Sequence, residues 1–526
     1  MTRSSLIDAA PRVDETLLQQ LEARANVPPD RPGIPVLAPF TEEEIGSVPQ
    51  ATEADVTTAV ETARAAQESW AAMGAVARAR ILSRFHDLLI ERADTAMDLI
   101  QLEAGKARIP AFEEVYDTVA TTRYYTKTGP RLLKPKRRQV SLPGFTSAWE
   151  YRHPHGVVAN ICPWNFPFTL AISDVVAALI AGNAVVIKPD EKTPFSALYA
   201  ATLLDKAGLP EGVLQVVTGY GEEIGPHLVD EVDFVVFTGS TEVGRQVGEQ
   251  AGRRLIGATM ELGGKNAAIV LADADLDRTI PGISRAVYAN GGQLCIAMER
   301  IYVAEAISEE FTRRFVEHTR SLPMTSDFDF SSALSSLISR QHLENVHRHV
   351  EDAISNGATL LTGGKPRPDI GPLFYEPTVF TDVDEGVLLC RAETFGPVVT
   401  IYPYRDLEDA IAAANDSEFG LNFSVWTSDS RRGVKIAQRL EAGTVGINDG
   451  YAATWSTYDA PMGGMKASGL SRRHGAIGLL KFTESQTIAV QRLIPAFAPP
   501  PGMDYEKYQK VLGPLLKLLK RVPFYK

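Results

Sequence analysis

Cysteine is scarce in this sequence. Only three of the 526 residues are cysteines, and Cys162, Cys295 and Cys390 are far apart. Three scattered cysteines cannot build a disulfide framework, and no Cys-x-x-Cys or Cys/His spacing predicts a zinc site. We therefore expect no bound metal and a reducing compartment, most simply the cytoplasm.

Long apolar runs are also missing. The longest apolar stretch covers residues 175–187 and contains Gly182 and Asn183. It falls short of the roughly 20 residues that span a bilayer, so we interpret it as a buried helix end, a turn and a strand at 184–188. Residues 1–28 contain no apolar segment of the kind found in a secretory signal. The sequence predicts neither a membrane span nor export.

Basic charge is in deficit. The chain has 53 basic and 65 acidic residues, a net charge of −12. Because phosphate binding needs a basic face, this balance argues against a nucleic-acid partner. The exception is the tail 497–526, which begins at an Ala-Pro-Pro-Pro-Gly break and is basic. Its apolar residues at helical spacing predict a helix that docks on the acidic enzyme or a neighbouring subunit, and weak binding to an anionic membrane is the alternative.

The pattern along the chain predicts an α/β protein with two large domains, since one core rarely exceeds roughly 250–300 residues. Residues 54–104 have the apolar spacing of helices. Short β-rich runs then alternate with helical segments, which is typical of doubly wound parallel sheets. The expected strands of the first sheet are 157–162, 184–188, 213–218 and 234–238, and those of the second are 266–271, 301–303, 398–402, 423–426 and 444–448. Two β segments, 139–152 and 487–493, belong to neither alternation.

A Pro-Trp-Asn-Phe-Pro motif at 163–167 follows the first strand of the first alternation. The flanking prolines stiffen the loop, so the side-chain N–H of Asn165 is a candidate donor to an oxyanion. The alternative is a turn in which the Asn caps the next helix, and the motif alone favours that alternative.

A glycine-containing turn follows the strand 234–238. Gly239 and Ser240 stand where this strand runs into a helix, and such a helix N-terminus offers N–H groups and a hydroxyl to a phosphate. The alternative is an ordinary N-capped helix, because the motif is not Gly-x-Gly-x-x-Gly. Lys188 and Glu191 close an earlier strand, and dinucleotides bind at such strand ends of a parallel sheet.

Three further motifs are candidates for a reaction centre. Glu261 precedes Leu262 and a Gly-Gly pair, Cys295 ends an Asn-Gly-Gly-Gln-Leu-Cys loop, and Glu393 lies two residues before Phe395. A cysteine after a glycine-rich loop is sterically open, and nearby N–H groups can hold negative charge. The alternatives are a solvated Glu in a linker, a small buried Cys, and a strand entry with ordinary packing.

Together, the order and spacing of these motifs resemble the aldehyde dehydrogenase superfamily over about residues 40–493. The resemblance implies that Cys295 is the nucleophile and Glu261 the general base. It also implies that Asn165 and the Cys295 backbone N–H form the oxyanion hole. The product would be a carboxylic acid released from a thioester.

The same resemblance implies how a nicotinamide dinucleotide is bound. The implied contacts are Trp164 and Ser240 at the pyrophosphate, Lys188 and Glu191 at the adenosine ribose, Gly239 at a close approach, Leu262 near the nicotinamide, Glu393 at the nicotinamide ribose and Phe395 beside it. We expect NAD to be preferred over NADP, because Glu191 would repel a 2′-phosphate unless Lys192 points inward to offset it.

The family fold further implies domain boundaries. The expected cofactor domain is 1–135 and 156–262, and the expected catalytic domain is 263–484. Residues 136–155 and 485–496 would form a small β arm that joins subunits into a homodimer or homotetramer. The small-molecule partner would be an aldehyde.

Within the superfamily the pattern is most similar to succinate-semialdehyde dehydrogenases of the second bacterial type, through the segments 371–378, 460–464 and 472–475. Three positions depart from it. Asp174 stands where many members have lysine, and Ser173 and Ala289 stand where well-known succinate-semialdehyde enzymes have arginines. Without these arginines no clamp for a substrate carboxylate is evident, although Arg152 or Arg472 could serve.

The expected reaction is therefore the oxidation of succinate semialdehyde to succinate. A dehydrogenase for an apolar or aromatic aldehyde is the alternative, because Phe168, Trp455 and Tyr458 could line such a pocket. A CoA-acylating enzyme, a cysteine hydrolase without redox chemistry and a catalytically silent binding protein are further alternatives. The Glu261 base, the ribose carboxylates and the intact Cys/Glu/Asn set argue against these three in turn.

Overall fold

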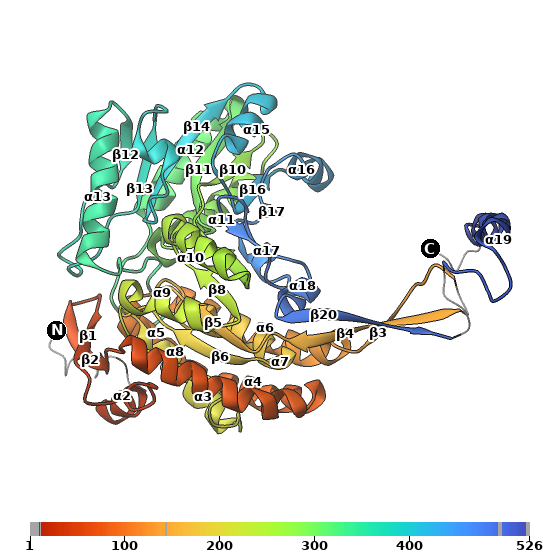
Figure 1. The fold of residues 1–526 in the computed structure, drawn as a ribbon. Coiled ribbons are helices and arrows are strands. Elements are labelled where there is room, and N and C mark those ends of the chain that lie inside the picture. Colours follow the sequence, from red (N-terminus) through yellow and green to blue (C-terminus); the bar gives the residue numbers. More distant parts are fainter. Residues whose placement is uncertain (1–9, 11, 143–144, 493–496, 522–526) are drawn as a thin grey trace.

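The computed structural model describes residues 10, 12–142, 145–492 and 497–521. Two α/β units carry a long β arm that projects from the body (Figure 1). Ahead of the first large sheet lie a short helix, a hairpin and four helices. Their bounds are α2 Glu15–Glu22, β1 Gly33–Ala38, β2 Glu43–Pro49, α3 Glu53–Ala72, α4 Ala75–Glu91, α5 Ala93–Ala104 and α6 Arg108–Leu132. The helices expected over 54–104 are thus confirmed, whereas the hairpin was missed.

The first large sheet has six strands in the order β19-β9-β8-β5-β6-β7. Strands β5, β6 and β8 are buried along their whole length, which explains their unbroken apolar sequences. All four expected strands are present, and the third is shorter than expected. The elements are β5 Val157–Ile161, α7 Thr169–Ala181, β6 Ala184–Lys188, α8 Pro194–Lys206, β7 Leu214–Val216, α9 Gly221–Glu231, β8 Phe234–Thr238, α10 Thr241–Arg254, β9 Gly257–Glu261 and β19 Gly469–Leu470.

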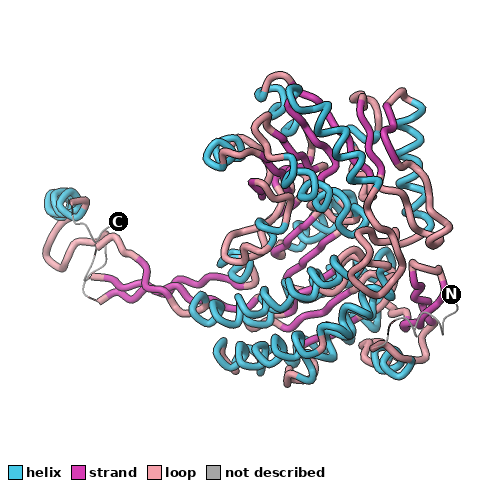
Figure 2. Tube along the Cα trace, turned by 180° about the vertical axis from the view of Figure 1, so that it is seen from behind, coloured by secondary structure: helices cyan, strands magenta, loops and turns pink. Residues whose placement is uncertain are grey.

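The second large sheet has seven strands in the order β12-β13-β14-β11-β10-β16-β17. The five expected strands are all present, and strands β12 and β13 at one side of the sheet were missed. Helices flank this sheet in Figure 2. Its elements are β10 Asn266–Val270, α11 Leu276–Tyr288, the 3₁₀ turn η1 Ala289–Gly292, β11 Met298–Ala304, α12 Glu305–Arg320, α13 Arg340–Ser355, β12 Thr359–Thr362, β13 Thr378–Thr381, α14 Leu388–Arg391, β14 Val398–Tyr404, α15 Leu407–Asn415, β16 Asn422–Trp426, α16 Ser430–Ala437, β17 Thr444–Ile447 and α17 Ala452–Trp455.

A three-stranded antiparallel sheet forms the projecting arm, in the order β20-β4-β3. Its strands are β3 Lys136–Arg138, β4 Thr146–Pro154 and β20 Thr483–Gln491, and the helix α19 Tyr505–Leu519 lies at the far end of the arm (Figure 1). The two outlying β segments are therefore real, although β20 starts four residues earlier than the sequence suggested. Residue 493 of that expectation, and residues 493–496 of the expected arm, lie outside the described residues.

The connections place several loops at one edge of the first sheet. Parallel strands β5, β6 and β8 end at the same edge, where the loop after β5 carries Asn165 and β6 ends at Lys188. Strand β9 ends at Glu261, opposite Gly469 of the antiparallel strand β19. The remaining short elements are β15 Phe419–Gly420, β18 Met465–Lys466 and α18 Gly475–Leu480. The C-terminal segment around β19 thereby returns to the edge where β9 ends.

Candidate active site

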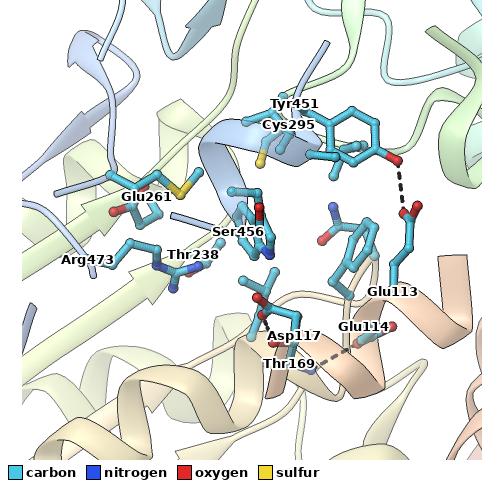
Figure 3. Close-up of a pocket in the computed structure, with 18 of the residues that line it drawn as sticks. Glu113, Glu114, Asp117, Thr169, Thr238, Glu261, Cys295, Tyr451, Ser456 and Arg473 are labelled. Atoms are coloured by element: carbon cyan, nitrogen blue, oxygen red, sulfur yellow. Dashed lines mark hydrogen bonds between the residues drawn. The ribbon is translucent and has the colours of Figure 1, made fainter. Parts of the chain in front are cut away.

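The three residues expected to carry the chemistry line one cavity. Cys295, Glu261 and Asn165 all border a space of about 240 Å³ between the two large sheets. Figure 3 shows the sulfur of Cys295 directed into this space, with Glu261 and Arg473 on one side. They come from the loop after β5, the end of strand β9 and the loop before β11, so the fold has brought together residues that the sequence placed 130 positions apart (295 − 165).

The loop that presents Cys295 has an unusual backbone. Asn290, Gly291 and Gly292 all have positive φ angles, of 53°, 65° and 75°. A Cβ at Gly292 would lie 2.0 Å from the carbonyl oxygen of Gly396, so a side chain does not fit there. Burial, together with the nearby carboxylates of Glu393 and Glu261, raises the pKa of the Cys295 thiol to about 12. The thiol therefore needs a base or a positive charge before it can attack.

Glu261 is a buried carboxyl group with a tuned pKa. Burial raises this pKa and Arg473 and Lys481 lower it, and the net result is a pKa of about 7. Its Oε1 atom is buried and has no hydrogen-bond partner among the described residues. A carboxylate that titrates near neutral pH and faces a cavity is suited to accepting a proton from water.

The amide of Asn165 is fixed by its neighbours. Its Nδ2 donates to the carbonyl oxygen of Gln293 at 3.1 Å, and Asn290 donates to its backbone oxygen at 3.0 Å. Asn165 does not cap helix α7, so the capping alternative is wrong. The carboxylate of Glu114 performs that task by accepting from the N–H groups of Phe168 and Thr169 at 2.5 and 3.1 Å.

A second cavity adjoins the first at Cys295, Glu261 and Asn165. Six of the eight residues expected to bind the cofactor line it, namely Trp164, Gly239, Ser240, Leu262, Glu393 and Phe395. Ser240 is also the N-cap of α10, accepting from the N–H of Val243 at 3.4 Å. Ser240 therefore both caps helix α10 and lines the cavity.

Glu393 and the two aromatic residues shape the far wall of this second cavity. Burial raises the pKa of Glu393 to about 8, although its Oε1 accepts from the backbone N–H of Gly264 at 2.8 Å. Phe395 adopts a positive φ of 55° and its ring meets that of Trp164 edge-on, with centroids 5.5 Å apart. This arrangement provides a flat apolar wall next to a polar group.

Lys188 and Glu191 lie outside this cavity, after strand β6. The Lys188 Nζ atom is 3.5 Å from one Glu191 oxygen, and Lys192 Nζ is 2.7 Å from the other. Lys192 also lies 3.4 Å from Asp190. Glu191 is thus flanked by two ammonium groups. Their positive charge weakens the repulsion of a 2′-phosphate that the sequence led us to expect.

The wall opposite the cofactor side contains charged residues that sequence reasoning missed. Arg285 forms an ion pair with Glu113, and the hydroxyl of Tyr451 donates to Glu113 at 2.9 Å. Asp117 accepts from the hydroxyl of Tyr458 at 2.9 Å (Figure 3 shows this wall). The sequence signal that could have found this wall is Arg285, which stands one helical turn before Ala289, a position singled out in the sequence.

The substrate-side candidates from the sequence have mixed outcomes. Trp455 and Tyr458 line the cavity, whereas Phe168 is buried in the core and is not part of its lining. Arg152 forms an ion pair with Glu150 in the arm. Arg472 donates to two backbone carbonyl oxygens and does not border the cavity. Neither arginine is placed to clamp a substrate.

The described residues contain neither a metal-binding cluster nor a helix that could span a membrane. No cluster of three or more His, Cys, Asp or Glu side chains there has the arrangement of a metal site. No helix in the described part of the chain has the length and apolar character needed to cross a bilayer.

Comparisons with known proteins agree with one another. A model described as the aldehyde dehydrogenase family matches residues 27–488. A protein of Mycobacterium ulcerans, provisionally named succinate-semialdehyde dehydrogenase (NADP+) 2, is 49% identical over 92% of this chain and 93% of its own. A phenylacetaldehyde dehydrogenase of Pseudomonas fluorescens is 38% identical over 86% of this chain and 92% of its own. The NAD+ complex of an aldehyde dehydrogenase from Bacillus cereus superposes with a TM-score of 0.83, at 35% identity, covering 88% and 93% of the two chains.

Proposed function

Because this chain belongs to the aldehyde dehydrogenase family, an oxidoreductase family, we propose that it oxidises an aldehyde to an acid through a thioester on Cys295. The observation that carries this proposal is the meeting of two cavities at one place. Cys295, Glu261 and Asn165 border both of them, so an aldehyde on one side would face a dinucleotide on the other. No metal takes part in this proposal.

Each residue has one task in the proposed reaction. The thiolate of Cys295 attacks the aldehyde carbon, and the carbonyl electrons move to oxygen. Asn165 Nδ2 and the Cys295 backbone N–H hold that oxyanion. After the oxidation, Glu261 takes a proton from water, the water oxygen attacks the thioester carbon, and the carbon–sulfur bond breaks to release the acid.

The described residues fit a nicotinamide dinucleotide, which would supply the hydride acceptor. Trp164, Gly239 and Ser240 would hold the pyrophosphate, because Ser240 opens helix α10 and its N-terminus attracts anions. Glu393 would hold the ribose next to the nicotinamide. Lys188 and Glu191 would contact the adenosine ribose, Phe395 would lie beside the nicotinamide ribose, and Leu262 would lie near the ring.

For the cofactor we propose that NADP is accepted as well as NAD. The expected preference for NAD rested on repulsion by Glu191, and that carboxylate lies between Lys188 and Lys192. The similar mycobacterial proteins are also provisionally named for NADP+, which does not support a preference for NAD.

For the substrate we propose succinate semialdehyde first. Support comes from the provisional names of the mycobacterial relatives at 48–49% identity. The residue best placed to meet the distal carboxylate is Arg285, which borders the cavity at the end of α11. It would have to exchange its partner Glu113 for the substrate.

An apolar or aromatic aldehyde is the second candidate, and one observation favours it. The two arginines that border the cavity already have partners within the protein, as Arg285 pairs with Glu113 and Arg473 with Asp174. Much of the remaining wall is apolar or aromatic, formed by Phe166, Leu170, Leu294, Ile296, Leu421, Trp455 and Met462. Such a wall suits a neutral side chain.

Reduced nicotinamide formed from a panel of aldehydes, with NAD or NADP and with or without CoA, tests these proposals. We expect Cys295→Ala to abolish the signal with every aldehyde. Arg285→Gln should raise KM for succinate semialdehyde, because the binding free energy loses roughly the 1.5–3 kcal/mol of a charge-assisted hydrogen bond. KM for benzaldehyde should not change. A strict dependence on CoA would mean an acylating enzyme, and ester hydrolysis without redox chemistry would mean a hydrolase.

We also propose that the arm joins subunits, in a homodimer or homotetramer. Strand β20 is exposed at every position after Thr483, and Ile488 and Val490 are 44% and 51% exposed. The proposed domains remain 1–135 with 156–262 for the cofactor, and 263–484 for catalysis. Strand β19 of the catalytic segment adds an edge to the cofactor sheet.

A further inference from the structure

A buried cluster of three charged side chains lies behind Glu261. The carboxylate of Asp174, on helix α7, accepts from Arg473 Nη2 at 2.5 Å and from Lys481 Nζ at 2.8 Å. None of the three side chains is more than 5% exposed. Asp174 is the position at which this sequence departs from the lysine of many relatives, so the departure is accommodated by two cations from the C-terminal part of the chain.

Only Arg473 connects this cluster to the catalytic cavity. It borders the same space as Cys295 and Glu261, whereas Asp174 and Lys481 are not among the lining residues. Its backbone is fixed by two hydrogen bonds with Met462, of 2.7 and 2.8 Å. Figure 3 shows Arg473 beside Glu261, on the same side of the cavity.

Two buried polar atoms at this place have no hydrogen-bond partner among the described residues. They are Oε1 of Glu261 and Nε of Arg473. A buried donor or acceptor without a partner costs free energy, so its presence in a reaction site calls for a role. Gly463 lets the chain pass close to this carboxylate, because a Cβ there would lie 3.1 Å from Glu261 Oε1.

We propose that Arg473, anchored by Asp174 and Lys481, is a positioning residue that keeps the Glu261 carboxylate ionised and directed at the attacking water. The inference rests on the proposed role of Glu261 as the base. Arg473 touches neither of the bonds that change, and it acts through the charge and orientation of Glu261.

The charges around Glu261 support this role. Asp174, Arg473 and Lys481 together carry a net charge of +1, and loss of Arg473 would reduce it to zero. Burial by itself would raise the pKa of Asp174, but Lys481 and Arg473 hold it well below its usual range, so it stays ionised.

The other ionisable groups near Glu261 are Arg472, His474 and Cys295. Arg472 also lowers the pKa of Glu261. His474 is neutral at working pH, because burial and Arg473 lower its pKa to about 3. Arg473 also lowers the pKa of Cys295, so its loss would affect both halves of the reaction, and they must be measured separately.

The test compares Arg473→Gln with Arg473→Lys in the full-length protein. The burst of reduced nicotinamide reports the first half of the reaction, and steady-state turnover across pH 6 to 10 reports hydrolysis. We expect Arg473→Gln to move the midpoint of the steady-state profile upward by about one pH unit, with turnover about fivefold lower at pH 7 and recovered at high pH. Arg473→Lys should restore the midpoint.

Two further variants separate positioning from stability. Arg108 forms a similar buried ion pair with Asp98 away from the cavity, so Arg108→Gln should lower Tm without moving the pH midpoint. If Arg473→Gln does not fold, Lys481→Met should shift the midpoint in the same direction by a smaller amount. An unchanged midpoint in a folded Arg473→Gln protein, or in Lys481→Met when the first cannot be made, overturns the proposal.

Glu261→Gln distinguishes a wrong assignment of the base from a wrong role for Arg473. If this variant keeps full turnover, the base assignment itself is wrong. If it loses turnover while Arg473→Gln keeps the wild-type profile, the proposed function stands and only the role of Arg473 is wrong.

Discussion

Burial has opposite consequences for the two central residues. It raises the pKa of Cys295 to about 12 and that of Glu261 to about 7. For the cysteine this disfavours the reactive thiolate, whereas for the glutamate it moves a weak base to the pH at which proton transfer from water is efficient. The same desolvation therefore means that the Cys295 thiol must be activated before the proposed attack, and it makes Glu261 suited to the proposed hydrolysis.

Replacing Glu261 with Gln should separate the two halves of the reaction. The shape is kept and the base is lost, so steady-state turnover should fall by about 10²–10⁴-fold. The first turnover should survive as a burst approaching one reduced nicotinamide per site, with an acyl group on Cys295 that intact-protein mass spectrometry detects. Because Glu261 can also assist Cys295, the burst would be slower. Full steady-state turnover would require another base.

The pH profile of the wild-type protein follows from the raised pKa of Glu261. Below about pH 7 the carboxyl group is protonated and cannot accept a proton from water. Hydrolysis of the thioester should therefore rise as the pH passes through about 7, and quenched-flow measurements of acyl-enzyme decay would follow it. A decay rate that is flat from pH 5 to 9 would contradict this assignment.

Among the elements, the loop between α11 and β11 is the most constrained. Its three consecutive positive φ angles and the contact at Gly292 leave no room for a side chain. Strain of this kind persists only where the surrounding structure enforces it, and here it sets the position of Cys295.

Gly292→Ala should therefore lower the free energy of unfolding by at least about 1–3 kcal/mol and reduce the rate of thiol modification at Cys295. Gly386→Ala is a suitable control, because a Cβ at Gly386 has no atom within 4 Å and should change neither property. Urea unfolding and titration with a thiol reagent measure the two effects. Equal stability of the two variants would show that the loop can relax.

We expect the segment after strand β6 to decide between the two dinucleotides. Lys192 neutralises Glu191 and can offer charge to a 2′-phosphate. We expect Lys192→Met to lower kcat/KM for NADP by about fivefold to tenfold, as the loss of a partly screened charge implies, and to change the value for NAD little. Equal losses of kcat/KM with both cofactors would show that Lys192 contributes to binding a part that NAD and NADP share.

At the scale of the molecule, the arm carries helix α19 away from the body. The sequence suggested docking on the enzyme's own acidic surface, but α19 lies at the far end of the arm and does not contact the body of its own chain (Figure 1). Val511 and Leu518 are 56% and 62% exposed. Of the two docking sites considered, a neighbouring subunit is therefore the one that remains. Val522, an apolar residue of the helix expected in the tail, lies outside the described residues.

Deletion of residues 497–526 tests this interpretation. We expect the truncated protein to keep its activity per subunit and to sediment as smaller oligomers, because an apolar contact between subunits is lost. Co-sedimentation with anionic liposomes should be unchanged. Loss of liposome binding on deletion would instead support a membrane contact for the tail.

The sequence determined most of what is local. Buried parallel strands such as β6 and β8 are largely apolar runs, and residues 54–104 have the apolar spacing of helices, so the sequence pattern predicted them. The family motifs similarly indicated Cys295, Glu261 and Asn165, because each loop contains its own glycines or prolines. Strands β12 and β13 were missed, since each has only four residues and so gives little periodic signal.

Only the tertiary structure decided which distant charges meet. Asp174 and Arg473 are 299 residues apart in the chain, and Glu113 and Tyr451 are 338 apart. Nothing in their own segments indicates which partners these residues have, and a buried charge becomes interpretable only when its partner is known. For this reason the sequence could indicate candidates for the nucleophile and the base, whereas the charges around Glu261 and the lining of the cavity depended on chain packing.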